Sequence, residues 1–240
     1  VDSREIDLDL VVTGEHLSAG GSDNVEEAIH RDGLRITRKV EMLLTTDSPS
    51  GVNKSIGLGI IGMTDAFASL APDIVVVSGD RFEMFAATVA ASGLSIPIAH
   101  LFGGETTEGA IDEVYRHSMT KMAQLHFVAT KRYRNRVIQL GEHPERVFNF
   151  GSVAIDGLYQ TTLLPLKKLE QEIGFKFRET TFLVTFHPET LSTLSGIEQI
   201  RALLDALCEF EGVGLIFTYP NADAGHKIII EEIGKFVSDH

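Results

Sequence analysis

Short apolar runs alternate with longer amphipathic stretches along most of the chain. The runs at 74–77 and 96–101 read as buried strands, and residues 82–91 between them carry apolar side chains at helical spacing. Further strands are expected at 126–129 and 147–150, each after a helix. This repeated alternation predicts an α/β protein with a mostly parallel sheet and helices on both faces.

The region before these runs fits the same architecture. Alternating side chains predict strands at 7–13 and 35–41. A long helix is expected over 52–70, with Ser50 as its N-terminal cap and Pro72 just beyond its end.

The alternation pauses and restarts in the last third of the chain. Residues 161–181 are expected to form a polar helical segment, rich in lysine and glutamate, that marks a domain junction, so we expect a first domain at 1–160 and a second at 161–240. The second domain is expected to contain two strands, at 182–185 and 213–218, and two helices, at 197–209 and 224–237. Two strands are too few for a complete α/β domain, so the second domain is interpreted as incomplete.

The composition restricts the partners and the compartment. A formal net charge of −13 and a pI near 5.1 argue against nucleic acid or an anionic membrane as a partner, since both require clustered Lys and Arg. No apolar run approaches the ~18 residues of a membrane-spanning helix. Cys208 is the only cysteine, which excludes an internal disulfide and a cysteine zinc site, and a cytoplasmic location is expected.

The predicted strand at 74–77 is followed by a glycine, Gly79, and several charged side chains. Asp80 is either an N-terminal cap for the next helix, which aspartate favours, or a base or hydroxyl ligand at the edge of the sheet. Arg81 and Glu83 are expected to form a solvated pair. Ligands of parallel α/β sheets bind outside the carboxyl ends of the strands, so Asp80 is a candidate site residue.

The predicted strand at 96–101 ends in a glycine-rich turn formed by Gly103, Gly104 and Glu105. Glycine has no Cβ, so this turn could let the backbone approach a ligand closely, although an ordinary turn would have the same sequence. His100 is a polar residue inside the preceding apolar run. It is either a satisfied core histidine, which is the commoner case, or a ligand-binding residue.

The helix expected over 111–124 begins with two charged pairs. Asp112 and Arg116 are four residues apart, as are Glu113 and His117, so each pair shares a helix face. They are either ordinary surface pairs or a group suited to an anionic, polyhydroxylated substrate. The one basic cluster lies on several faces of the next helix and is interpreted as solvated; its members are Lys131, Arg132, Arg134 and Arg136.

Two turns of the second domain also carry polar side chains after strands. His187 is followed by Pro188, which keeps the backbone extended, and the turn at 220–223 contains Asn221 and Asp223. Both turns are candidates for ligand contacts at the strand ends. The sequence contains no phosphate-binding P-loop, no dinucleotide fingerprint and no zincin motif.

Taken in order, these motifs resemble the hydrolysing UDP-N-acetylglucosamine 2-epimerases of sialic and legionaminic acid pathways. The resemblance covers nearly the whole chain and is carried by TGEHLS (13–18), GDRFE (79–83), IAHLFGGE (98–105), GAIDE (109–113), RHSMTKMAQLHF (116–127), HPET (187–190) and PNADAGHK (220–227). It implies a glycosyltransferase-B-like fold of two Rossmann-like, doubly wound domains. It also implies that two elements of the family are absent from this chain, the first strand with its diphosphate loop and the serine-rich uridine loop.

The resemblance implies a reaction that needs no metal and no nicotinamide cofactor. C2 of the sugar loses its proton, UDP leaves by elimination, and water adds to the resulting glycal to give the manno sugar. One carboxylate must take the weakly acidic proton and another group must return one. The implied partners are a UDP-sugar and further copies of the chain in a homodimer or homotetramer.

The family's functional residues can be matched position by position. The implied catalytic residues are Asp80, Glu105, Asp112 and Arg116. The implied substrate-binding residues are Arg81, His100, His117, His187, Asn221 and Asp223, of which His187 matches a histidine that contacts the phosphates of the nucleotide. No metal ligands are implied.

Two departures from the family bear on the substrate. Phe102 stands where some members have a catalytic glutamate, so Glu105 would have to take that role. The segment between Glu105 and Asp112 is one residue longer than in the animal enzyme, a pattern similar to the bacterial branch acting on UDP-2,4-diacetamido-trideoxy sugars. An apolar Phe102 would suit a 6-deoxy sugar. Two alternatives stay open, a glycosyltransferase of the same fold and a sugar-nucleotide-binding protein without turnover.

Overall fold

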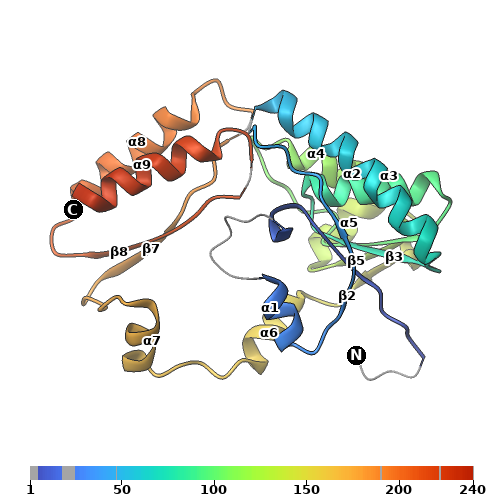
Figure 1. Ribbon diagram of the computed structural model, residues 1–240, viewed down its shortest axis with the longest axis horizontal. Helices are drawn as coiled ribbons and strands as arrows, with labels where there is room; N and C mark the ends of the chain where they lie inside the picture. Colours follow the sequence, from blue (N-terminus) through green and yellow to red (C-terminus); the bar gives the residue numbers. More distant parts are fainter. Residues whose placement is uncertain (1–4, 18–24, 47, 190, 222, 240) are drawn as a thin grey trace. The chain divides into compact units, whose positions relative to one another are not determined.

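The computed structural model describes residues 5–17, 25–46, 48–189, 191–221 and 223–239 (Figure 1). The chain divides into two compact units, Val1–Ser152 (unit 1) and Val153–His240 (unit 2). The sequence places the domain boundary eight residues later, after residue 160.

Unit 1 contains two parallel sheets. One pairs β1 (Leu10–Thr13) with β2 (Ile36–Val40). The other holds four strands in chain order, β3 (Val75–Ser78), β4 (Ile98–Leu101), β5 (Leu125–Val128) and β6 (Val147–Asn149). The helices are η1 (Gly14–Leu17), α1 (Val25–Arg31), α2 (Pro49–Leu70), α3 (Phe82–Gly93), α4 (Asp112–Met122), α5 (Lys131–Gln139) and η2 (Pro144–Arg146). The predicted strand–helix alternation and parallel pairing are confirmed.

Helix α2 begins earlier than the sequence predicts. Its N-terminal cap is Ser48, whose hydroxyl accepts a hydrogen bond from Gly51 N–H at 3.1 Å, and Pro49 occupies the first turn. The prediction of Ser50 as the cap is therefore wrong. Proline is well suited to the first helical position because its missing N–H would have no helical acceptor there.

One face of the four-stranded sheet forms the main core of unit 1. Val77, His100 and His126 occupy directly paired positions on β3, β4 and β5 and are 1%, 0% and 0% exposed. Apolar residues of α3 and α4 pack over β3 and β4 on this face, and α5 covers β5 and β6 through Val137. The polar rings of His100 and His126 therefore lie next to each other inside a mostly apolar layer.

The opposite face of β5 and β6 carries a row of aromatic rings. Phe127 and Phe148 stack at 5.4 Å between ring centroids, and Phe150 continues the row at 5.7 Å from Phe148. Phe150 is 76% exposed, so the row ends at the protein surface.

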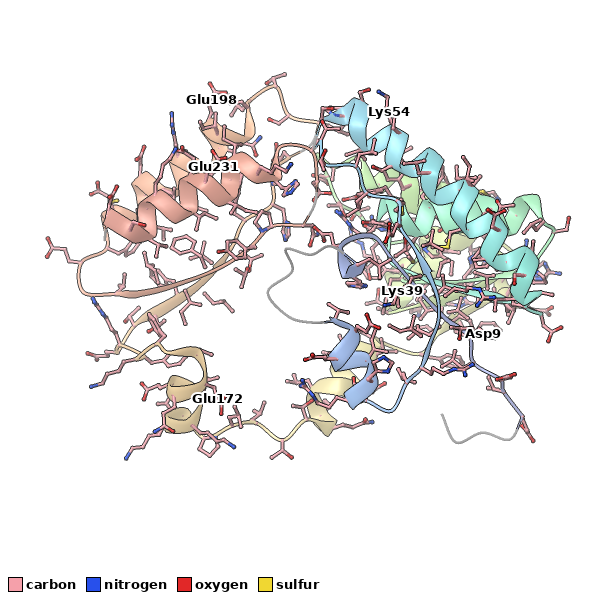
Figure 2. All side chains as sticks on the ribbon, viewed as in Figure 1. Asp9, Lys39, Lys54, Glu172, Glu198 and Glu231 are labelled. Carbon is pink, nitrogen blue, oxygen red and sulfur yellow. The ribbon has the colours of Figure 1, made fainter. Side chains whose placement is uncertain are left out.

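Unit 2 is smaller and has a two-stranded parallel sheet of β7 (Thr181–Thr185) and β8 (Gly214–Thr218). Helices α8 (Gly196–Cys208) and α9 (His226–Asp239) lie side by side over this sheet (Figure 1), with Ile200 and Ile229 fully buried between them and the strands. Their outer sides carry exposed carboxylates such as Glu198 and Glu231 (Figure 2).

Two further helices of unit 2 precede its sheet. Helix α7 (Leu166–Ile173) falls in the polar segment predicted to be helical, whereas α6 (Val153–Gln160) is not predicted. No helix in the described part of the chain has the length and apolar character needed to cross a membrane.

Candidate active site

The turns that follow β3 and β4 lie next to each other at one edge of the sheet. Ser78 and Leu101 are paired at the ends of the two parallel strands, and Gly79 N–H donates to the Leu101 carbonyl at 3.1 Å. The ends of β3 and β4 therefore bring Gly79 and the turn at Gly103 and Gly104 close together. This is the edge at which parallel α/β proteins bind ligands.

Asp80 is joined at this edge to the start of α4. Its carboxylate accepts a short hydrogen bond from Nη2 of Arg116, whose side chain is only 4% exposed. The N-terminal cap of α3 is Arg81, so the interpretation of Asp80 as that cap is wrong. Thr107 accepts a second bond from the same guanidinium nitrogen at 2.7 Å.

Glu113 completes the set of side chains around Arg116. Arg116 Nη1 donates to Glu113 at 2.9 Å, and the other carboxylate oxygen of Glu113 lies 3.0 Å from Nε2 of His117. The expected Glu113–His117 pair is confirmed. The alternative of an ordinary surface pair is wrong for Arg116, because its guanidinium is buried and shared between two carboxylates.

The charge on Glu113 is stabilised by several donors. Burial raises its pKa, but hydrogen bonds from Thr107 N–H at 2.7 Å and from His117, with the positive charge of Arg116, hold that pKa below its usual value. Asp112, half-buried at the first residue of α4, adds to the effect of burial in raising the pKa of the Tyr115 hydroxyl. The start of α4 is therefore an acidic surface organised around one arginine.

The pair of Arg81 and Glu83 is more buried than the sequence predicts. Arg81 Nε lies 3.7 Å from a Glu83 oxygen, and their side chains are 22% and 9% exposed. Glu83 also packs on Gly14 after β1, where an added Cβ would lie 2.7 Å from its Cγ. The prediction of a solvated pair is therefore wrong, and Glu83 connects the end of β1 to the start of α3.

Both glycines of the turn after β4, Gly103 and Gly104, pack closely against other residues of the protein. A Cβ on Gly104 would lie 2.4 Å from the carbonyl oxygen of Tyr133, and one on Gly103 would lie 3.1 Å from the Thr120 hydroxyl. Gly104 also has φ of +78°, which favours glycine. The glycines are thus required by packing, and close approach of a ligand to this backbone is not needed to explain them.

The basic cluster on α5 is partly engaged in this packing. Arg136 donates a short hydrogen bond to the carbonyl of Gly104, and Arg134 donates to the carbonyls of Val147 and Pro144 at 3.0 and 2.9 Å. The interpretation of all four basic residues as solvated is therefore wrong for Arg134 and Arg136.

Phe102 and Glu105 flank the two glycines. Phe102 has φ of +67°, a left-handed conformation that is uncommon for a bulky residue and often marks a functional site. Glu105 is half-buried and makes no hydrogen bond or ion pair with the residues that the structure describes. Its carboxylate therefore lies beside the turn without a bond to another described side chain.

His100 lies behind this edge. Its ring is 0% exposed, with Nε2 2.8 Å from the Gly79 carbonyl and Nδ1 3.2 Å from the Thr120 hydroxyl. The structure therefore has His100 as a satisfied core histidine, and direct contact of its ring with a substrate is not available in this conformation.

The predicted residues of unit 2 lie together at the ends of β7 and β8. His187 is exposed, and its Nδ1 accepts a hydrogen bond from Asn221 N–H at 3.4 Å. Asp223 is half-buried and its N–H donates to the Asn221 carbonyl at 2.8 Å. Residues 190 and 222 of these two motifs lie outside the described residues.

The side chains joined around Arg116, which are Asp80, Thr107, Glu113 and His117, form the unit 1 cluster. Sequence reasoning does not identify two threonines in or directly behind this cluster. Thr107 and Thr120 contribute hydroxyls to Arg116 and His100, yet an isolated threonine has no periodicity or charge that marks it. The only signal is that Thr120 falls within the RHSMTKMAQLHF motif. Within the described residues, no group of three or more His, Cys, Asp or Glu side chains is arranged to hold a metal ion.

The fold and this cluster define a class: an α/β protein with parallel sheets and a polar, acidic site at the carboxyl ends of its strands. The family model for UDP-N-acetylglucosamine 2-epimerase matches residues 1–239. The chain therefore belongs to this family, as the motifs of the sequence predict.

Three curated relatives match nearly the whole chain. A GDP/UDP-N,N′-diacetylbacillosamine 2-epimerase (hydrolysing) of Campylobacter jejuni is 38% identical over 96% of this chain and 59% of its own length. The polysialic acid biosynthesis protein P7 of Escherichia coli is 38% identical over 100% of this chain and 61% of its own length. A UDP-N,N′-diacetylbacillosamine 2-epimerase (hydrolysing) of Legionella pneumophila is 35% identical over 99% and 62%. The chain thus spans less than two thirds of each relative.

Solved structures support the fold. The UDP-GlcNAc 2-epimerase of Methanocaldococcus jannaschii, in complex with UDP-GlcNAc and UDP, matches with a TM-score of 0.70 at 17% identity, over 88% of this chain and 57% of that one. A Listeria monocytogenes homologue matches with a TM-score of 0.69 at 18% identity, over 97% and 58%. The expected α/β fold class agrees with these matches.

Proposed function

We propose that the protein containing these residues is a hydrolysing UDP-N-acetylhexosamine 2-epimerase. It breaks the C2–H and C1–O bonds of a UDP-sugar, forms a glycal and UDP, and then adds water across C1 and C2 to give the manno sugar. The observation that carries the proposal is the buried Arg116, which donates hydrogen bonds both to Asp80, after β3, and to Glu113, on α4. Family membership and the named relatives support it.

The reaction needs one group to remove the C2 proton and another to deliver one, and the cluster offers several carboxylates for this work. Asp80 is fixed in orientation by Arg116, whereas Glu105 has no bound partner among the described residues. We assign proton transfer to Asp80, Asp112 and Glu105, and assign to Arg116 the orientation of Asp80.

The remaining predicted residues, apart from the buried His100, are assigned to substrate binding. Arg81 borders the unit 1 cluster and His117 is part of it, and the sugar would lie there. His187, with Asn221 and Asp223, would contact the nucleotide's phosphates. The proposal requires no metal or organic cofactor, so dialysis against a chelator should leave the activity unchanged.

The finer proposal concerns the sugar. Two of the three relatives named above act, by their names, on N,N′-diacetylbacillosamine nucleotides, and the third belongs to polysialic acid biosynthesis. Phe102 places an apolar ring beside the glycine turn, which suits a 6-deoxy sugar. We therefore propose UDP-N,N′-diacetylbacillosamine as the preferred substrate and UDP-N-acetylglucosamine as the alternative.

The test is product analysis with the full-length protein. Each UDP-sugar is incubated with the enzyme, UDP release is measured, and the free sugar is identified by NMR. Release of the manno sugar supports the proposal. Transfer to an acceptor with the gluco configuration kept indicates a glycosyltransferase, and UDP binding with no product indicates a binding protein.

A variant pair tests the site itself. Asp112→Asn removes a carboxylate at the start of α4, and Asp65→Asn removes an exposed one from α2. Asp112→Asn should lower kcat by about 100-fold or more, in the range of a lost general acid or base, whereas Asp65→Asn should not. Undiminished turnover by a folded Asp112→Asn protein would refute the assigned role.

The proposed assembly is a homodimer or homotetramer in the cytoplasm. Light scattering of the purified full-length protein measures the assembly directly. A monomer at micromolar concentration would contradict this part of the proposal and leave the reaction unaffected.

A further inference from the structure

His100 is a buried titratable group for which the proposed reaction has no direct use. It contacts two segments that carry the reacting side chains. Its Nε2 lies 2.8 Å from the carbonyl of Gly79, the residue before Asp80. Its Nδ1 lies 3.2 Å from the hydroxyl of Thr120, one helical turn beyond Arg116. The imidazole therefore bridges the backbone on both sides of the Asp80–Arg116 ion pair.

The partners of His100 determine its tautomer. A carbonyl oxygen only accepts hydrogen bonds, so Nε2 must carry a proton to bond to Gly79. Burial lowers the pKa of His100 to about 4, although the Gly79 carbonyl opposes this shift, so the ring is neutral at neutral pH. Nδ1 is therefore an acceptor, and it faces the Thr120 hydroxyl.

Thr120 connects this ring to the backbone of Arg116. Its hydroxyl lies 3.0 Å from the Arg116 carbonyl and 3.2 Å from His100 Nδ1, so its single proton is shared between two acceptors. Thr120 is 0% exposed. A Cβ on Gly103 would lie 3.1 Å from the hydroxyl and 3.3 Å from Nδ1, so the turn after β4 closes over this contact.

We propose that His100 and Thr120 are positioning residues, which hold the Gly79–Asp80 turn and the Arg116 turn of α4 at the spacing that keeps Asp80 and Arg116 bonded. The effect that this positioning role has on turnover rests on the function proposed above. The proposal assigns His100 a role behind the site, acting through Gly79 and Thr120, and not in contact with substrate.

Substitutions at Thr120 test this without replacing a large buried ring. Thr120→Val keeps the shape and removes the hydroxyl, whereas Thr120→Ser keeps the hydroxyl and removes a methyl group. Thr88 on α3 is a matched control, because it is also 0% exposed and its hydroxyl donates to a carbonyl four residues earlier, at 2.7 Å, without a hydrogen bond to any histidine that the structure describes.

The positioning role predicts a specific pattern of kinetics in the full-length enzyme. Thr120→Val should lower kcat by about 10- to 100-fold with KM little changed, as expected when a reacting group is displaced by a fraction of an ångström. Thr120→Ser and Thr88→Val should retain near-normal kcat. Equal losses in Thr120→Val and Thr120→Ser, or normal turnover in Thr120→Val, would overturn the proposal.

A second measurement does not depend on turnover, so it tests the positioning role of His100 and Thr120 separately from the proposed enzymatic function. In a double-mutant cycle of urea stability, Asp80→Asn should cost less in the Thr120→Val background than in the wild type, because the ion pair is already loosened. The ¹⁵N shifts of His100 should report the neutral Nε2–H tautomer. Additive stability costs, or the Nδ1–H tautomer, would overturn the positioning role even in an active enzyme; failure of the wild type to release UDP would instead overturn the function.

Discussion

Arg116→Lys tests whether the buried guanidinium organises the unit 1 cluster. Lysine keeps the positive charge but presents a single compact ammonium in place of a planar fork of donors. In the structure, the fork donates to Asp80, Glu113 and Thr107 from two nitrogens. A lysine ammonium at this position cannot reach all of these acceptors from one point.

The size of the effect follows from these bonds. Each hydrogen bond to a charged group contributes about 1.5–3 kcal/mol and each neutral one about 1 kcal/mol. Lysine should recover one of the charged bonds, and water should partly replace the other, since Asp80 and Glu113 are 23% and 30% exposed. We therefore expect Arg116→Lys to lower the free energy of unfolding by about 2–3 kcal/mol. Removing the charge altogether with Arg116→Met should cost about 3–5 kcal/mol.

The assay is urea denaturation of the full-length protein at pH 7, followed by circular dichroism. Arg38→Lys is the matched control, because Arg38 is exposed and donates to Thr37 and Ser69 at 3.2 Å each. It should change the free energy of unfolding by no more than about 0.5 kcal/mol. Equal effects of the two substitutions would refute the reasoning, since they would mean that burial and the shared carboxylates contribute nothing.

Three further substitutions test other parts of the structure. Because burial lowers the pKa of folded His100 to about 4, from about 6.5 in the unfolded chain, the free energy of unfolding should fall by up to about 3 kcal/mol from pH 6.5 to 4. His100→Gln should flatten that fall, and an equally steep curve contradicts this. Gly104→Ala should be about 1–3 kcal/mol more destabilising than Gly33→Ala, which has a similar φ and open space, by thermal melting. Ser48→Ala should cost about 1 kcal/mol in urea and Ser50→Ala almost nothing; the reverse order would restore the predicted cap.

The sequence was sufficient to predict the strands and their parallel pairing. Apolar runs of strand length separated by helical periods leave few alternatives, and the observed β3 and β4 begin and end within two residues of the predicted ones. Helix α6 was missed because 153–160 contains Gly157 and exposed apolar residues such as Tyr159, so it lacks a clear buried stripe. The start of α2 was predicted too late because Ser50 was chosen as its N-terminal cap instead of Ser48. Pro49, which suits the first helical position, was a signal for the earlier start.

The candidate site was predicted as a list of residues and not as a set of contacts. The spacing of Glu113 and His117 determines their pairing, because residues four apart share a helix face. The bond from Asp80 to Arg116 spans 36 residues and depends on how α4 packs against the sheet, which local spacing does not specify. The same is true of Gly104, which lies in the turn after β4, whereas its close neighbour Tyr133 lies on α5, beyond β5.

The strand order of the larger sheet has a consequence for how the protein is made. Each of β4, β5 and β6 pairs with the strand immediately before it along the chain, so the sheet can be extended one strand at a time as the polypeptide emerges from the ribosome. In the described part of the chain, all hydrogen-bond acceptors of the Arg116 guanidinium precede it in the sequence. The acidic cluster can thus assemble during translation, before the residues of unit 2 have been synthesised.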